Sequence, residues 1–185
     1  DAAGGRSEAA LRSLLTGVER MISGIGHRLS RQGASPCMAL LPFSPNHGSF
    51  GGDGFYGEAK AGLEVLFNKW HSEREAWAAG TLLCGTVIGW VRGTGLMDAN
   101  NAVAPGLEEL CGIRTFSSAE MGFLVAALCS PSLRAACAEA PLRADLSGGL
   151  MGVADLRGKV ESIRAEQNQA LAYSKALLAL ETGYF

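Results

Sequence analysis

A serine, a tyrosine and a lysine form the part of this sequence best suited to carry out a reaction. Ser44 ends an apolar run, Tyr56 follows it by twelve positions, and Lys60 comes four positions later. Reducing a ketone requires a hydride on carbon and a proton on oxygen. Tyrosine alone is a weak acid at neutral pH, but a nearby ammonium stabilises the tyrosinate. A serine hydroxyl would hydrogen-bond to the carbonyl oxygen and hold it beside the tyrosine.

The elements that must position these residues are a strand and a helix. Residues 37–43 form a short, continuous apolar run, which is typical of a strand buried on both faces. Ligands of open α/β sheets bind at the carboxyl ends of the strands, so Ser44 would point into a crevice. Tyr56 and Lys60 are four residues apart at the start of a predicted helix and share one face. An ordinary surface pair on an amphipathic helix has the same spacing, so spacing leaves both interpretations open.

Strands and helices alternate along the rest of the chain. Strands are predicted at 37–43, 81–88 and 113–116, and helices at 7–31 (with Ser7 as N-cap), 55–78, 117–129, 131–140 and 155–180. A capping box formed by Ser117 and Glu120 opens the helix at 117. This alternation predicts an α/β fold with a parallel sheet. Only about three strands are present, whereas a doubly wound nucleotide-binding sheet has about six.

Composition excludes several classes of function. A net charge of −2 does not favour nucleic acid or an anionic membrane as partner. Apolar stretches stop well short of the ~20 residues of a membrane span. The five cysteines have no CxxC pair and no histidine at ligand spacing, so we expect small buried hydrophobes in a reducing compartment and no metal. The N-terminus has no signal-peptide pattern and no initiator Met, so the chain is expected to be processed or a piece of something longer.

Residues 40–125 resemble a known family much more specifically. The matching stretches are LPFSPNHGSFGGDGFYGEAK, LEVLFNKWHSE, IGWVRGTGLMDANN and GIRTFSSAEMGF, with a weaker DLSGGL at 145–150. They are similar in order and spacing to the ketoreductase domain of the fungal-type (type I) fatty acid synthase alpha subunit, a relative of the short-chain dehydrogenases/reductases. The resemblance implies the C-terminal half of a Rossmann-like parallel sheet with flanking helices. It divides the chain into a flexible N-terminus at 1–6, the C-terminal half of a ketoreductase domain at 7–150 and a C-terminal helical tail at 151–185.

The resemblance also implies roles for individual residues. Tyr56 would be the proton donor, Ser44 would orient the carbonyl, and Lys60 would stabilise the tyrosinate and hold the nicotinamide ribose. The segment containing Gly89, Trp90 and Thr94 would line the nicotinamide pocket. The implied reaction reduces a 3-oxoacyl group on an acyl carrier protein to the 3-hydroxyacyl thioester, with NADPH as cofactor. The implied location is cytoplasmic, with an organelle also possible.

Nothing in the sequence supplies the nucleotide-binding half of such an enzyme. Neither GGDG at 51–54 nor the glycines at 93 and 95 form a GxGxxG fingerprint after a strand. NADPH would therefore be bound mainly by residues outside this chain, and other chains or segments of a large assembly are expected partners. Two hypotheses stay open: a segment of a working reductase, or a reductase-derived fragment with a purely structural role.

Three further residues have two interpretations each. His47, in the loop beside Ser44, either contacts substrate or makes a structural hydrogen bond. Trp90 either packs or recognises a ligand. Arg92 either meets a phosphate, such as that of a carrier-bound substrate, or is simply solvated.

Overall fold

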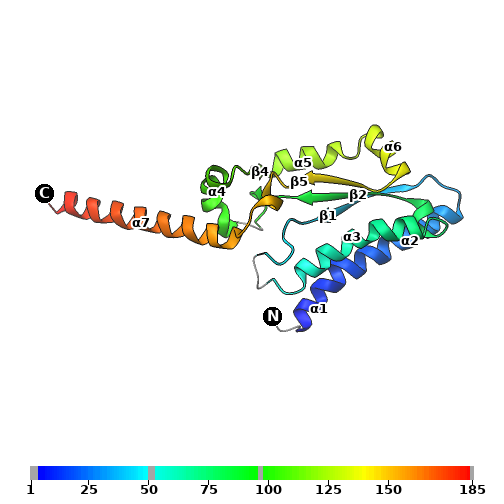
Figure 1. The fold of residues 1–185 in the computed structure, drawn as a ribbon, viewed down its shortest axis with the longest axis horizontal. Coiled ribbons are helices and arrows are strands. Elements are labelled where there is room, and N and C mark those ends of the chain that lie inside the picture. The colour runs from blue at the N-terminus through cyan, green and yellow to red at the C-terminus, as the bar shows by residue number, and fades with distance from the viewer. Residues whose placement is uncertain (1–3, 50–52, 96–97, 184–185) are drawn as a thin grey trace.

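A three-stranded parallel sheet organises the molecule. This computed structural model describes residues 4–49, 53–95 and 98–183. Strands β1 (Cys37–Phe43), β2 (Thr81–Ile88) and β5 (Leu142–Leu146) pair in the order β1-β2-β5, with Cys37 opposite Thr81 and Cys84 opposite Leu142. Helices flank both sides of the sheet (Figure 1). The α/β class with a parallel sheet is thus confirmed, and the arrangement is consistent with part of a Rossmann-like fold.

Each face of the sheet has its own core. Helices α2 (Gly17–Arg31) and α3 (Tyr56–Ser72) cover one face, and α5 (Ser118–Ala127) and α6 (Pro131–Glu139) lie on the other (Figure 1). The first core is built from ten buried residues: Ile22, Leu41, Phe43, Leu63, Leu66, Trp70, Trp77, Ala78, Leu83 and Val87. The second is smaller and joins Leu82 and Cys84 of β2 to Leu128 and Cys137. Because β2 is buried on both faces, its sequence is continuously apolar or small.

The first predicted helix is longer and less regular than its pattern suggested. It begins at Gly5 as α1 (Gly5–Leu11), with Gly4 as N-cap, so the prediction of Ser7 as N-cap was wrong. A π-helical turn at Arg12–Thr16 connects α1 to α2. In that turn the Thr16 hydroxyl donates to the carbonyl oxygen of Arg12 at 3.0 Å.

Helix α3 ends at Ser72, six residues before its predicted end. The backbone turns at Glu73, whose carboxylate accepts a hydrogen bond from the indole N–H of Trp77. A short 3₁₀ helix, Trp77–Gly80, then leads into β2. The turn allows Trp77 and Ala78 to enter the core beside α2, which a straight continuation of α3 would prevent.

The third strand of the sheet is not the one predicted. Residues 113–116 were expected to form it, but β4 is Phe116–Ser117 and pairs with β3 (Val91–Arg92) in a separate two-stranded ladder. The sheet is completed by β5, which the sequence reading missed. Its residues alternate between partly buried and exposed, as expected of a strand at a sheet edge.

The C-terminal part is helical. Helix α4 (Ala104–Cys111) packs against the first turns of α7 (Leu156–Thr182) through a third core cluster that contains Leu107, Leu156, Val160 and Ile163. Beyond Ile163 the residues of α7 are exposed, and the helix extends away from the rest of the chain (Figure 1). The predicted helix at 155–180 is confirmed, with Asp155 as its N-cap.

The five cysteines are all free thiols but differ in exposure. Cys84 and Cys137 are buried as predicted, whereas Cys37 and Cys129 are exposed, so the prediction was wrong for those two. The described residues contain no group of three or more histidine, cysteine or acidic side chains able to hold a metal. Among the same residues, no single helix is long and apolar enough to cross a membrane. Helices α5 and α6 reach the required length and apolar composition only when taken together, and they are bent by 59° relative to each other.

Candidate active site

Ser44 lies directly after β1, at the carboxyl end of the sheet, and is 6% exposed. Its Oγ accepts a hydrogen bond from the backbone N–H of Asn46 at 3.1 Å. This bond uses an acceptor site of the hydroxyl and leaves its hydrogen available to donate. Ser44 thus follows a parallel strand, as predicted. The prediction that this strand is buried on both faces was wrong, because β1 lies at the edge of the described sheet and its Cys37 and Pro42 are exposed.

Tyr56 and Lys60 lie on the first two turns of α3, as their spacing predicted. Tyr56 is the first residue of the helix and is partly buried, and the Lys60 ammonium lies 5.5 Å from the centre of its ring. At this distance the cation interacts with the face of the aromatic ring. The pair is therefore not an ordinary exposed surface pair, since Lys60 is only 7% exposed.

Lys60 is also attached to the strand that carries Ser44. Its Nζ donates to the carbonyl oxygen of Pro42 at 2.8 Å, two residues before Ser44. Burial lowers the pKa of the Lys60 ammonium. Of the three N–H groups of the Lys60 ammonium, one has a hydrogen-bond acceptor among the described residues. Lys60 thus joins Tyr56 to the end of β1, although no hydrogen bond connects Ser44 with Tyr56 among the described contacts.

The loop between β1 and α3 is braced by its own polar groups. The Asn46 side chain donates to Asp53 at 3.0 Å and accepts from the backbone N–H of Ser49 at 3.0 Å. The loop also packs closely on α3, because a Cβ added at Gly57 would lie 2.8 Å from the Gly48 nitrogen. Part of the predicted glycine-rich motif, residues 50–52, lies outside the described residues.

The segment after β2 is held in place mainly by packing. Gly89 donates its N–H to the Leu146 carbonyl at 3.1 Å, and a Cβ there would meet the Ser147 carbonyl oxygen at 2.4 Å. Trp90 is 2% exposed within the third core cluster, beside Val103 and Ile113. Thr94 is exposed, with its hydroxyl 3.4 Å from the Val91 carbonyl oxygen. Their role as a nicotinamide pocket stays a prediction.

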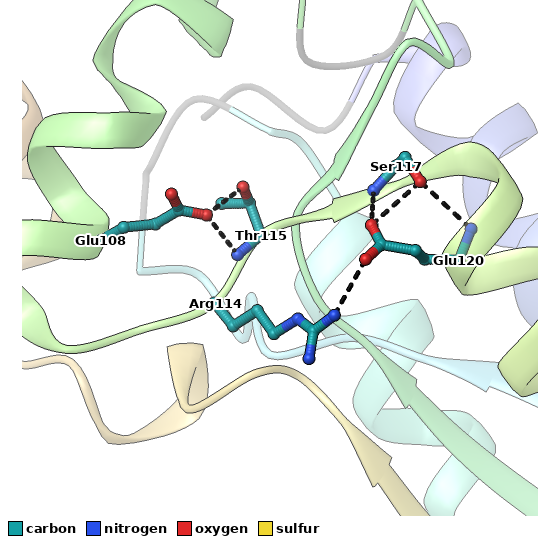
Figure 2. Close-up of polar contacts among 5 residues, drawn as sticks. All are labelled: Glu108, Arg114, Thr115, Ser117 and Glu120. Carbon is teal, nitrogen blue, oxygen red and sulfur yellow. Dashed lines mark hydrogen bonds and ion pairs between the residues drawn. The ribbon is translucent and has the colours of Figure 1, made fainter.

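A polar network connects residues 114–117, around β4, to helices α4 and α5 (Figure 2). The carboxylate of Glu108, on α4, accepts from both the backbone N–H and the hydroxyl of Thr115. These bonds hold the pKa of Glu108 below its ordinary value. Next along the chain, Phe116 donates its backbone N–H to the Trp90 carbonyl at 2.9 Å. The network therefore fixes β4 beside the residues that follow β2.

The other half of this network is the predicted capping box. The Glu120 carboxylate accepts from the backbone N–H of Ser117 at 2.8 Å and binds Arg114 at 2.8 Å, while the Ser117 hydroxyl accepts from the Glu120 N–H (Figure 2). Because these bonds favour the charged form, they lower the pKa of Glu120 to about 2. The predicted capping box is confirmed.

Two charged residues near the site were missed by the sequence reading. Glu64 lies one turn beyond Lys60 on α3, and its carboxylate faces His47 at 3.6 Å and Arg143 of β5 at 3.3 Å. The four-residue steps from Tyr56 to Lys60 to Glu64 were the available signal for Glu64. Arg143 was not detectable because β5 was not recognised. The structural hydrogen bond expected of His47 is not found among the described contacts; its Nε2 instead lies 3.6 Å from the Glu64 carboxylate.

The fold and the residues at its carboxyl edge define a partial α/β parallel-sheet domain with a serine–tyrosine–lysine set. No family model matches the chain. It is similar to a segment of fatty acid synthase subunit alpha from several fungi. Identity is 48% over 174 residues with the protein of Emericella nidulans, covering 93% of this chain and 10% of the relative.

Two yeast proteins give the same result. Identity is 44% over 179 residues with fatty acid synthase subunit alpha of Lachancea kluyveri, and 45% over 179 residues with that of Saccharomyces cerevisiae. Each alignment covers 96% of this chain and 9% of the relative. The chain therefore spans about a tenth of the length of the proteins it matches, and over that length it is similar to one segment of fatty acid synthase subunit alpha.

Proposed function

We propose that this chain is the acid–base part of a 3-oxoacyl-[acyl-carrier-protein] reductase within a type I fatty acid synthase. The observation that carries the proposal is the link from Tyr56 through Lys60 to the end of β1, where Ser44 lies. The similarity to fatty acid synthase subunit alpha supports the same context, a larger assembly. A cytoplasmic location belongs to this proposal too.

The residues have distinct tasks in this reaction. The Ser44 hydroxyl donates a hydrogen bond to the substrate carbonyl oxygen, since its acceptor side is engaged by Asn46. Tyr56 donates the proton to that oxygen as it becomes negatively charged. The buried Lys60 ammonium stabilises the resulting tyrosinate. The product is the 3-hydroxyacyl thioester.

NADPH would supply the hydride, and this chain's residues fit one part of it. A buried lysine with N–H bonds left to donate, at the carboxyl edge of a parallel sheet, suits a ribose hydroxyl. The sequence has no GxGxxG fingerprint after a strand that would bind the pyrophosphate. The nucleotide would consequently be held mainly by a part of the synthase outside this chain.

The test compares Tyr56→Phe with wild type in the intact synthase. NADPH oxidation with an acetoacetyl thioester is followed by absorbance, and loss of the proton donor should lower kcat by about 10²- to 10⁴-fold. Tyr173→Phe, which changes an exposed tyrosine on α7, is the matched control and should retain the wild-type rate. Equal rates for Tyr56→Phe and wild type would refute the enzymatic role.

A structural role is the second candidate. It is favoured by one observation: β1 pairs only with β2 among the described strands, so an edge of the sheet is left for another element. If the intact assembly shows no NADPH-dependent reduction and no NADPH binding, the fragment serves as scaffold alone.

A further inference from the structure

A charged trio connects three separate elements beside the candidate site. Glu64 of α3 lies between His47, in the loop after β1, and Arg143 of β5. One carboxylate oxygen, Oε1, is buried and has no hydrogen-bond partner in the described structure; it lies 3.6 Å from Nε2 of His47. The other, Oε2, accepts from Arg143 at 3.3 Å.

The same loop determines the orientation of Ser44. His47 directly follows Asn46, whose backbone N–H donates to Ser44 Oγ. The backbone of His47 and Gly48 packs on the first turn of α3, with only 2.8 Å between the Gly48 nitrogen and the position of a Cβ on Gly57. A displacement of His47 would therefore be transmitted over one residue to the bond that orients the serine.

We infer that Glu64 is a positioning residue for Ser44, holding the loop through His47 while Arg143 fixes the carboxylate from β5. A carboxylate suits this place because its two oxygens face the Arg143 guanidinium at 3.3 Å and the His47 imidazole at 3.6 Å. Each contact alone is partly exposed and weak, but one carboxylate shared by two elements restrains both. The effect on catalysis rests on the proposed function, whereas the restraint on the loop does not.

The first test measures hydrogen exchange by mass spectrometry in the intact synthase. In Glu64→Gln, the peptide covering Ser44–Ser49 should exchange roughly two- to fivefold faster than in wild type, because the amides of Asn46 and Ser49 are bonded within this loop. Glu109→Gln removes the same charge from an exposed position on α4 and should change nothing there. Unchanged exchange in Glu64→Gln would overturn the inference.

The second test separates positioning from general stability. Glu64→Gln and Arg143→Gln should each lower kcat about three- to tenfold at an unchanged KM for NADPH, and Arg143→Lys should restore most of the loss. The double variant of Glu64→Gln and His47→Gln should be no slower than the slower single variant, since both changes act on the same Glu64–His47 contact. If Tyr56→Phe is inactive but Glu64→Gln shows faster exchange with an unaltered kcat, the role of Glu64 in orienting Ser44 is refuted. If Tyr56→Phe is fully active, the proposed function fails and the exchange data still decide whether Glu64 holds the loop.

Discussion

Replacing Gly89 with alanine tests why a glycine follows β2. A Cβ at this position would lie 2.4, 2.7 and 2.8 Å from the carbonyl oxygen, carbonyl carbon and Cα of Ser147. Comfortable contact distances are about 3.5–4.0 Å, so Ser147 would have to move by about 1 Å. All three atoms are backbone, and no side-chain rotation relieves the contact.

The free-energy cost of moving Ser147 can be estimated from the hydrogen bonds that hold it. Ser147 is fully buried, its N–H donates to Asp145 at 2.8 Å, and its carbonyl accepts from Leu150 at 3.2 Å. Overpacking costs about 1–3 kcal/mol, and weakening one such bond adds about 1 kcal/mol. We expect Gly89→Ala to lower the free energy of unfolding by ~3 kcal/mol, and the Tm by roughly 6–12 °C.

Urea denaturation of the chain, followed by fluorescence of its buried tryptophans, measures this difference. Gly24→Ala is the control: Gly24 is exposed on α2 with no atom near its Cβ position, and alanine there should stabilise the helix by about 0.5–1 kcal/mol. A Gly89→Ala variant within about 0.5 kcal/mol of wild type would refute the close contact. Because this glycine is needed for packing, loss of activity in Gly89→Ala would not by itself identify a nucleotide contact.

Two further predictions concern titration and thiol reactivity. The pKa of Glu120 is lowered to about 2, so its contribution to stability is complete above pH 4.5, the ordinary value, and is lost as the pH falls through the folded value. The difference in Tm between wild type and Glu120→Gln should therefore shrink as the pH is lowered from 4.5 to about 2, and a constant difference would contradict the prediction. Iodoacetamide should modify the exposed Cys37 and Cys129 first, because burial raises the pKa of the thiols of Cys84 and Cys137 and shields them; equal labelling of all four, read by peptide mass spectrometry, would contradict the described core.

The sequence was most informative where local pattern and burial agree. The bounds of β1 and β2 were predicted to the residue, because continuous apolar runs bounded by proline, glycine and serine have few alternatives. The capping box at Ser117 was predictable for the same reason, since both partners lie within one turn. Positions of Ser44, Tyr56 and Lys60 followed from these elements.

What the pattern could not predict depends on contacts distant in sequence. β5 is only five residues long, and it pairs with β2 across more than fifty residues. Its alternating burial arises because Leu142, Ala144 and Leu146 pack against the second core while the residues between them face away from it. The end of α3 is determined by the bond from Trp77 to Glu73 and by the entry of Trp77 into the core, neither of which is a local propensity. Glu64 lies on the same face of α3 as Tyr56 and Lys60, which their four-residue spacing predicts. Its partner Arg143 lies on β5, the strand that was not predicted.

The position of the acid–base residues bears on the two candidate functions. Ser44 follows β1, Lys60 binds the Pro42 carbonyl on β1, and β1 pairs with β2 alone among the described strands. A parallel strand added at the free edge would bring its own carboxyl end next to Ser44, and ligands of such sheets bind at that edge. A nucleotide-binding segment docked there would present its hydride donor at the same edge of the sheet as Ser44. An unrelated structural segment would cover the edge equally well but would leave the other two N–H groups of the buried Lys60 ammonium without a ligand, and a buried cation with unsatisfied donors is costly. The burial of Lys60 at this edge therefore favours the reductase over the scaffold.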